Sequence, residues 1–339
     1  DFSAGGSYVA GTTGSTTVSL PVLNKGNGGF TTTFSVQNTA SDEATVNVNY
    51  SDGTKVENVK IPPNAAAVFD QATENHTAKN FAGTVTSDKP VVASALQESS
   101  SIIFSYLAFS TSGTPKPLFP LVNINNAGYV TAIQIQNGGN QSTDVTVSYT
   151  PSGTDGTACT ETQTIPAGQA KNFTLNVFSG NPAGITTTCI NKQKFVGSAV
   201  VSANSANQPL IGIINQLGST DGEAYGSFSS DDATAKVSLP LIMDRNGGFY
   251  TGINVLNAGT SDTKVTCTFS KSTYKVEKTL NPGEALNDLQ INKMTTDPKG
   301  YVGSGVCTGD SGSKLVAVVN QASTVGGQDR LYVYEGINN

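Results

Sequence analysis

Apolar and polar residues alternate with a period of two along much of the chain. In residues 30–37, Phe30, Phe34 and Val36 share one parity, and Thr33 and Ser35 share the other. Such alternation predicts a strand with one face buried in an antiparallel sheet. The same alternation recurs in residues 46–50, 129–135, 145–149, 249–255 and 265–269. Turn sequences such as SDG, PSG and NPG separate the predicted strands, so the pattern favours an all-β protein.

Three stretches of the sequence are related to one another without a gap: SLPVLNKGNGGFTTTFSVQN, LFPLVNINNAGYVTAIQIQN and SLPLIMDRNGGFYTGINVLN. Each contains a proline nine residues before an aromatic residue, which stands eight residues before an asparagine. In order, these are Pro21, Phe30 and Asn38; Pro120, Tyr129 and Asn137; and Pro240, Phe249 and Asn257. The prolines are 99 and 120 residues apart, which is about the size of a small domain. The chain is therefore an array of three related units.

About seven short strands per ~100 residues, with turns between them, are typical of an immunoglobulin-like sandwich. The stretches that could form helices, residues 64–72 and 284–293, are short and lack a sustained helical period. We therefore predict an all-β fold of three tandem immunoglobulin-like β-sandwich domains with an extended N-terminal arm. The predicted boundaries are 1–18 for the arm, 19–115 for unit 1, 116–235 for unit 2 and 236–339 for unit 3. The repeated aromatics Phe30, Tyr129 and Phe249 are predicted to bury their rings in the cores.

Four cysteines lie in units 2 and 3, with Cys159 and Cys189 30 residues apart and Cys267 and Cys307 40 residues apart. No Cys-x-x-Cys pair is present, so the spacing does not favour zinc. Cys267 takes a core position that is valine in the other two units, and Cys307 stands where a bridge between two sheets is geometrically sensible. We predict one disulfide within each of these units, with four buried thiols as the alternative. Such disulfides indicate an oxidising compartment outside the cytoplasm.

Charged residues make up only 13% of the chain, and the net charge is −6. With two arginines, the chain has no basic stripe for phosphate groups, which argues against a nucleic-acid partner. No apolar run approaches the ~18–20 residues of a membrane span. The first residue is Asp and not Met, which indicates a processed N-terminus from which an export signal has been removed. These features favour an extracellular or cell-surface protein.

The sequence contains no recognisable catalytic constellation. Its single histidine, His76, lies in the polar stretch ENHT without a nucleophile motif, and is expected to be a solvated loop residue. Asp231 and Asp232 lie between units 2 and 3, but no calcium-loop motif accompanies them. Most other aspartates stand in turns, where the side chain caps the backbone; they are Asp52, Asp88, Asp155, Asp221 and Asp310. We therefore predict a protein that is not an enzyme and has no metal or cofactor.

Four Asn-x-Ser/Thr sequons are candidate N-glycosylation sites; they are Asn49, Asn75, Asn140 and Asn172. The chain contains no tryptophan, whereas exposed Trp or Tyr platforms are typical of sugar-binding faces. An adhesin or carbohydrate-binding array, with a host surface or glycans as partners, is therefore the alternative hypothesis to a structural protein.

The N-terminus copies the segments that join the units. A tyrosine stands 14 and 15 residues before the prolines of units 2 and 3, and Tyr8 stands 13 residues before Pro21. At the other end the matching residue is Tyr332 or Tyr334. Residues 1–18 therefore look like a closing strand and linker. Such an arm either folds back and protects the edge of unit 1, or adds as a strand to unit 3 of another copy.

An arm followed by sandwich units resembles the donor-strand subunits of prokaryotic surface pili and threads. The resemblance covers the arm and the sandwich pattern. It implies a homopolymer, because a head-to-tail contact that does not close on itself produces an open filament. The predicted arm residues are Phe2, Tyr8, Val9 and Val18. The predicted acceptor residues are Gln321, Leu331, Tyr332, Val333 and Tyr334. The sequence thus favours a secreted structural subunit of a cell-surface filament.

Overall fold

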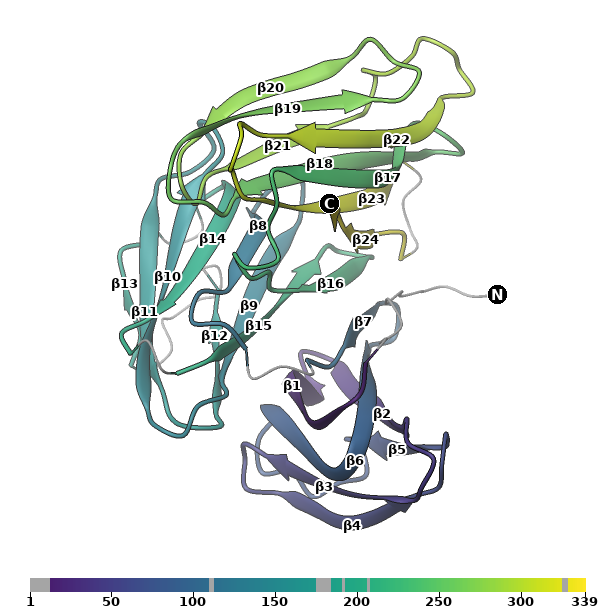
Figure 1. Ribbon diagram of the computed structural model, residues 1–339, viewed down its shortest axis with the longest axis vertical. Helices are drawn as coiled ribbons and strands as arrows, with labels where there is room; N and C mark the ends of the chain where they lie inside the picture. The colour runs from purple at the N-terminus through teal and green to yellow at the C-terminus, as the bar shows by residue number, and fades with distance from the viewer. Residues whose placement is uncertain (1–12, 110–112, 175–183, 191–192, 206–207, 325–328) are drawn as a thin grey trace.

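The computed structural model describes residues 13–109, 113–174, 184–190, 193–205, 208–324 and 329–339 (Figure 1). Within these residues the chain is all-β, with 62% of it in strands and no helix. The alternation read from the sequence becomes alternating burial, as at Val46, Val48 and Tyr50, which point into the core. The all-β prediction is confirmed, and the arrangement of sheets is sandwich-like.

Unit 1 is built around one long strand that belongs to two layers. The strands of unit 1 are β1 (Ser15–Asn27), β2 (Phe30–Asn38), β3 (Ala44–Tyr50), β4 (Lys55–Ile61), β5 (Ala66–Asp70), β6 (Asn80–Glu98) and β7 (Ile103–Leu107). The first half of β6 pairs with β1 and β3, and β4 extends that layer. The second half of β6 pairs with β2 and β7, and β5 extends the other layer. All of these pairings are antiparallel.

Unit 2 repeats this plan as two separate sheets, ordered β13-β11-β10-β14-β8 and β12-β9-β15-β16. Its strands are β8 (Leu118–Ile124), β9 (Val130–Asn137), β10 (Thr143–Pro151), β11 (Cys159–Ile165), β12 (Ala170–Phe173), β13 (Thr186–Thr187), β14 (Phe195–Ala203), β15 (Leu210–Leu217) and β16 (Gly222–Gly226). The pair β14 and β15 corresponds to the two halves of β6. The other strands follow in the order of unit 1, with β13 as an addition.

Unit 3 has sheets ordered β20-β19-β22-β17-β25 and β21-β18-β23-β24. Its strands are β17 (Lys236–Asp244), β18 (Phe249–Asn257), β19 (Thr263–Phe269), β20 (Lys275–Leu280), β21 (Ala285–Leu289), β22 (Tyr301–Thr308), β23 (Leu315–Ser323), β24 (Tyr332–Glu335) and β25 (Ile337–Asn338). The three repeated stretches of the sequence therefore form the first two strands of each unit, which follow one another along the chain.

The repeated prolines lie at the same irregularity in the first strand of each unit. The register shifts between Leu20 and Leu23 in β1, and equivalent shifts surround Pro120 in β8 and Pro240 in β17. Proline has no N–H to donate, so it is tolerated where the ladder is interrupted. The repeated proline thus marks a β-bulge.

A tyrosine of the closing strand holds each bulge in place. The hydroxyls of Tyr106, Tyr225 and Tyr334 each donate at 2.6 Å to the carbonyl oxygen of the residue that follows the proline. The equivalent of Tyr106 in unit 3 is therefore Tyr334 and not Tyr332. Burial raises the pKa of all three hydroxyls well above the ordinary tyrosine value, because these sites disfavour the phenolate.

The repeated asparagines are fully buried and organise the corner after β2, β9 and β18. In unit 2, Asn137 Nδ2 donates to the carbonyl oxygens of Gln141 and Ile165 at 2.7 and 3.0 Å, and its Oδ1 accepts from the Gly139 N–H. Asn38 and Asn257 make the equivalent bonds. A carboxamide is needed because it donates twice and accepts once at a buried position.

The repeated aromatics are less buried than predicted. All three are half-buried. Phe30 and Phe249 begin their strands, and Tyr129 directly precedes β9. The Phe30 ring stacks on Phe104 at a centroid distance of 4.9 Å, and Tyr129 donates to Asp221 Oδ2 at 2.9 Å. These rings cover the open end of the sandwich, because the turn before them places them beyond the last core layer.

Candidate functional site

The joints between units are the most elaborate contacts in the molecule, and the two joints follow one design. The β9–β15 sheet of unit 2 lays its outer face over β1 of unit 1, and the β18–β23 sheet of unit 3 lays its outer face over β8 of unit 2 (Figure 1). Unit 2 therefore uses two different surfaces: the edge around its bulge, which receives unit 3, and a sheet face, which covers unit 1.

The joint between units 1 and 2 is formed largely by side-chain amides. Gln134 Nε2 donates to the Pro21 carbonyl oxygen at 2.7 Å, and Gln169 Nε2 donates to the carbonyl oxygen of Ser51 at 2.7 Å. Gln136 Nε2 donates to Thr84 Oγ1 at 3.3 Å. Gln134 and Gln136 are almost fully buried although they lie on the outer parity of β9.

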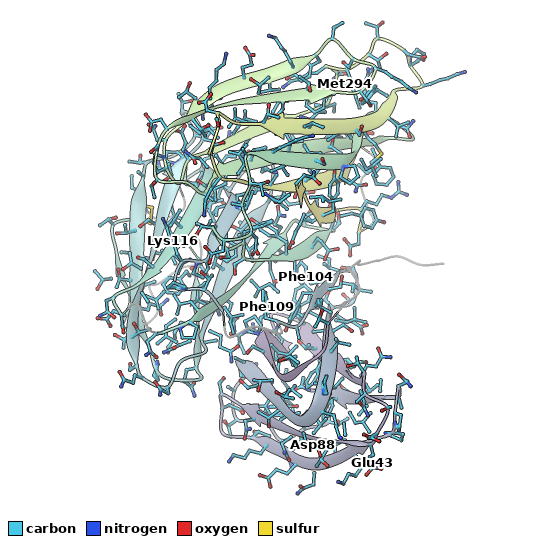
Figure 2. All side chains as sticks on the ribbon, in the orientation of Figure 1. Glu43, Asp88, Phe104, Phe109, Lys116 and Met294 are labelled. Atoms are coloured by element: carbon cyan, nitrogen blue, oxygen red, sulfur yellow. A yellow bond between two sulfur atoms is a disulfide. The ribbon has the colours of Figure 1, made fainter. Side chains whose placement is uncertain are left out.

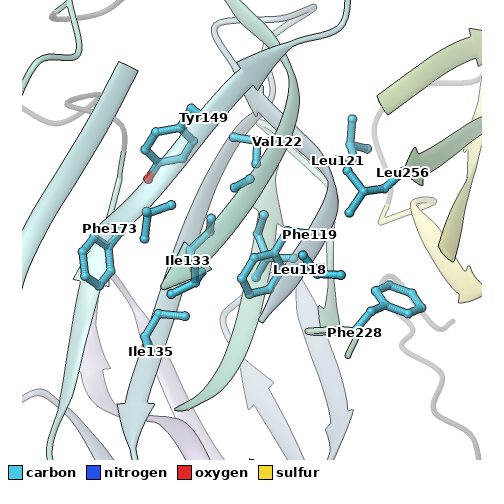
Figure 3. Packing of buried hydrophobic residues seen from close by; sticks show 14 of the residues in the cluster. Leu118, Phe119, Leu121, Val122, Ile133, Ile135, Tyr149, Phe173, Phe228 and Leu256 are labelled. Atoms are coloured by element: carbon cyan, nitrogen blue, oxygen red, sulfur yellow. The ribbon is translucent and has the colours of Figure 1, made fainter. Parts of the chain in front are cut away.

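The joint between units 2 and 3 is apolar at its centre. Leu256, Val316 and Val318 lie on the outer parity of their strands, yet all three are completely buried. They belong to the same hydrophobic cluster as the core of unit 2. Figure 3 shows Leu256 beside Leu121 at the edge of that cluster. The apolar outer face of unit 3 therefore extends the core of unit 2 across the joint, while the interior of unit 3 forms a cluster of its own.

One pair of amides recurs at both joints. Gln97 of unit 1 and Asn215 of unit 2 exchange hydrogen bonds of 3.5 and 3.2 Å. Gln216 of unit 2 and Asn320 of unit 3 do the same at 3.1 and 2.9 Å. Gln97 and Gln216 lie at equivalent places, one residue before the ends of β6 and β15, so this glutamine is a joint residue in both units.

The closing strands of the three units converge on one carboxylate. Asp329 of unit 3 accepts the backbone N–H of Ile103 in unit 1 through Oδ2 and that of Gly222 in unit 2 through Oδ1, both at 3.0 Å. A Cβ atom at Gly222 would lie 2.4 Å from the Phe104 ring, and one at Gly226 would lie 3.0 Å from the Phe109 ring. Figure 2 shows Phe104 and Phe109 at this boundary. The glycines therefore allow unit 1 to approach β16 closely.

The two ends of the array expose surfaces that are covered inside it. Pro21 and Pro120 are buried beneath the next unit, whereas Pro240, at the equivalent position of unit 3, is exposed. Gln37 of unit 1 is exposed, whereas Gln136 and Leu256, its equivalents in units 2 and 3, are buried. Among the described residues, one bulge edge, at Pro240, and one sheet face, at Gln37, are therefore uncovered.

Both predicted cysteine pairs form disulfides. Cys159 and Cys189 are bonded with Cα atoms 4.9 Å apart, and Cys267 and Cys307 with Cα atoms 4.0 Å apart. The second bond joins register partners on β19 and β22, so it lies within one sheet and not between two sheets as expected. The bond lies within one sheet because its two positions face each other across neighbouring strands. In the other units these positions are cross-strand valine pairs, Val48 with Val85 and Val147 with Val201.

Three of the predicted arm residues, Phe2, Tyr8 and Val9, lie outside the described residues. Val18 lies in β1 and is buried in the core of unit 1 itself. Residues 15–18 are therefore part of the sandwich of unit 1, which shortens the segment that is left for an arm. Ser15 already pairs with Val91 of β6.

The predicted acceptor residues are occupied by contacts within unit 3. Residues 332–335 form β24 on the edge of β23, and Gln321 pairs with Tyr332 across these strands. Leu331 is buried and Val333 is half-buried. Unit 3 therefore has its own closing strand, and an added strand would have to use the outer edge of β24.

The four sequons fall into two classes. Asn49, Asn75 and Asn140 are exposed. Asn172 is half-buried in the first joint, where its Nδ2 donates to Asn80 Oδ1 at 3.1 Å. The atom that would carry a glycan at Asn172 is thus engaged in a contact between units.

His76 is not a solvated loop residue, contrary to expectation. Its side chain is fully buried, its ring stacks on Phe81 at 3.9 Å, and its Nδ1 lies 3.1 Å from Asp52 Oδ2. Burial would raise the pKa of Asp52, but the backbone N–H groups of Thr54 and Thr77 and the His76 ring lower it below its ordinary value. Aromatic neighbours that are distant in sequence buried this histidine, and the loop composition could not indicate them.

The chain matches no family model, no curated protein and no solved structure. Among the described residues, no helix is long and apolar enough to span a membrane. The same residues contain no group of three or more His, Cys, Asp or Glu side chains that could hold a metal ion. The joint amides were missed by reasoning from the sequence, although the glutamines on the outward parity of β9, Gln134 and Gln136, are a signal that could have indicated them.

Proposed function

We propose that this protein is a structural subunit of an extracellular surface filament in which copies join head to tail. The observation that supports this most strongly is the difference between Pro21 and Pro120, which are covered by the next unit, and Pro240, which is not. In the proposed filament, unit 1 of one copy covers β17 of another copy as unit 2 covers β1. The sheet face of unit 1 and the bulge edge of unit 3 are different surfaces, so the contact is heterologous and does not close.

The path of the chain supports the same joint. In each unit, a residue after the closing strand pairs with the residue that stands two before the repeated proline. The pairs are Phe109 with Ser19, Phe228 with Leu118, and Ile337 with Ser238. Ile337 is 54% exposed. A copy that continued the array would therefore begin close to Ile337.

The entry points of the units also correspond. Thr114 enters unit 2 by pairing with Leu210, and Thr234 enters unit 3 by pairing with Leu315. Ser15 enters unit 1 by pairing with Val91 in the same way. In the sequence, the residues before Ser15 correspond to the linkers that precede Thr114 and Thr234, and we assign them to contact with unit 3 of the neighbouring copy.

The sheet face of unit 1 is more polar than its equivalents. Ser94 takes the place of Ile213 and Val318, and Thr33 takes the place of Ala132. A polar face buries little apolar surface when it is covered. The face alone would therefore bind weakly, and strand addition by the arm would supply the remaining affinity through backbone hydrogen bonds of ~1 kcal/mol each.

The remaining parts of the proposal concern the domains and the location. We propose that each unit is an immunoglobulin-like domain, which is supported by two antiparallel layers in each third of the chain. We propose secretion because two disulfides are compatible with an oxidising compartment. The role is structural rather than catalytic, and its partner is another copy of the chain.

The experiment compares assembly of the full chain with two variants. Deletion of residues 1–12 removes the segment before the first sheet and leaves β1 whole. Leu241→Glu places a charge on the uncovered bulge edge, where Leu241 is half-buried. Sedimentation velocity and negative-stain microscopy should show fibres for the full chain, and folded single particles for both variants.

A control variant, Lys60→Gln, changes an exposed residue on β4, away from both proposed contact surfaces. It should assemble as the full chain does. A full chain that stays monomeric, or a Leu241→Glu variant that forms the same fibres, would contradict the proposed joint. Fibres from the 1–12 deletion would show that the arm is dispensable.

A further inference from the structure

Each joint contains a cavity at the same place. A cavity of about 390 Å³ lies between units 1 and 2, and one of about 380 Å³ lies between units 2 and 3. Equivalent residues line them, such as Asn24 and Asn123 on the receiving unit and Asn215 and Asn320 on the covering unit. The cavities are therefore products of the repeated joint, and they can be compared position by position.

The amides of the first cavity are paired with one another. Asn24 Oδ1 accepts from Asn27 and Asn80, and Asn24 Nδ2 donates to Gln97. Asn172 Nδ2 donates to Asn80. This cavity is lined by a closed network of hydrogen bonds that ties units 1 and 2 together.

The second cavity has buried oxygens that no described residue satisfies. Asn287 stands where Asn172 stands in unit 2, and its Oδ1 is buried without a hydrogen-bond partner. Ser152 Oγ, from unit 2, is also buried without a partner and lines the same cavity. Lys278 Nζ of unit 3 fixes Ser152 by donating to its carbonyl oxygen at 2.6 Å. Two buried oxygens, one from each unit, thus have no hydrogen-bond partner. Leaving such buried groups unpaired lowers the stability of the folded state.

The walls of the second cavity define what could fill it. Tyr129, Tyr250, Leu121 and Leu331 provide apolar surface, and the described residues of the lining include no lysine or arginine. Asp155 and Asp288 also line the cavity, and each is paired with a lysine, Lys194 and Lys293. An anion would meet carboxylates and no free cation. A ligand with hydroxyl donors and an apolar face, and without negative charge, fits these walls.

We propose that the cavity between units 2 and 3 binds a neutral sugar residue. Its hydroxyls donate to Asn287 Oδ1 and Ser152 Oγ, and one face of its ring rests on the tyrosine and leucine walls. The site lies inside a single copy, so it does not depend on head-to-tail assembly. The cavity between units 1 and 2 lacks the two open oxygens, and so it does not bind the sugar.

The test is ligand-observed saturation-transfer NMR on the full chain with glucose, galactose, mannose and N-acetylglucosamine, and with inorganic phosphate as the anionic probe. At least one sugar should show transfer, and phosphate should show none. Ser152→Ala and Asn287→Ala should each weaken the binding about tenfold, as expected for one lost hydrogen bond. Asn172→Ala, at the matched position of the first joint, should leave sugar binding unchanged.

Several outcomes would overturn the assignment. They are the absence of transfer from all four sugars, equal weakening by Asn172→Ala and Asn287→Ala, or a crystal structure from sugar-soaked crystals in which only water contacts Ser152 Oγ and Asn287 Oδ1. Circular dichroism separates lost binding from lost folding, and Ser152→Ala is the milder variant because it removes a single oxygen.

Discussion

The two joints of this molecule follow the same plan but differ in the chemistry of their centres. The first is held by Gln134, Gln136 and Gln169, which donate to acceptors of unit 1. The second buries Leu256, Val316 and Val318 in the core of unit 2. A hydrogen-bonded joint contributes little net free energy per bond, because water offers the same bonds to the separated faces. Burial of apolar surface is more favourable.

The difference teaches how the molecule is expected to unfold. Units 2 and 3 share a hydrophobic cluster, so opening one exposes apolar surface of the other. Unit 1 has its own cluster, to which unit 2 adds Ile213, Ala224 and the partly buried Leu217. We therefore expect units 2 and 3 to behave as one cooperative block, and unit 1 to open separately.

The largest expected effect on stability comes from the disulfides, which lie in units 2 and 3. Replacing Cys267 and Cys307 by serine opens a loop of 40 residues, which should lower the free energy of unfolding by about 4 kcal/mol. Replacing both by valine should cost less, since valine pairs occupy these positions in the other units. Hydrogen exchange read by mass spectrometry should show lost protection in units 2 and 3, and unchanged protection in unit 1. Equal losses in unit 1 would refute the division into a block and a separate unit.

A second prediction compares one position in two joints. Val318→Ser places a hydroxyl in the apolar joint and should cost about 2 kcal/mol, from lost burial and an unpaired polar group. Ser94, its equivalent, lies on the uncovered face of unit 1, and Ser94→Val should change stability by less than about 0.5 kcal/mol. Chemical denaturation followed by circular dichroism measures both. Similar effects at the two positions would mean that the second joint is not a core.

A third prediction concerns acid. Burial would raise the pKa of Asp244, but the Arg245 guanidinium and the backbone N–H groups of Met294, Asn292 and Lys293 hold it below its ordinary value of 3.8. A lowered pKa in the folded state contributes stability above pH 3.8, and this stability is lost as the pH falls through the folded value.

Asp244→Asn should therefore cost roughly 1.5 kcal/mol at neutral pH and should flatten the acid-induced loss of stability in unit 3. Thermal unfolding should be measured from roughly pH 6 to roughly pH 2, a range that spans the titration of the Asp244 carboxyl. Hydrogen exchange locates the effect in the chain. A variant with the same acid profile as the unmodified protein would rule out Asp244 as the titrating group.

The smallest expected effect separates the closed joints from the open end. Tyr106→Phe and Tyr225→Phe each remove a buried hydrogen bond to the bulge and should cost about 1 kcal/mol. Tyr334 is less buried, because no unit covers it. Its replacement by phenylalanine should therefore cost less in the isolated protein. If fibres form as proposed, the cost of Tyr334→Phe should rise in the fibre to match the other two.

Much of the site could not be predicted, because the alternation along a strand shows which side chains face outward but not whether another unit covers that face. Gln37 and Gln136 have the same place in the repeat and the same outward parity, yet one is exposed and the other is almost fully buried. Likewise, the polar loop around His76 gave no sign that Phe81 and Tyr50 would enclose its ring. Both depend on segments that are distant along the chain.

The sequence by itself determined the all-β class, the three-fold repeat and the pairing of the cysteines, because strand period, proline–aromatic–asparagine spacing and separation along the chain are local quantities. Only the tertiary structure decided the order of the strands, the in-sheet position of the Cys267–Cys307 bond, and the faces that units bury against one another. Such contacts depend on surfaces assembled from several strands. Pro21, Pro120 and Pro240 read alike in the sequence, and only the packing of the next unit makes two of them buried and leaves the third exposed.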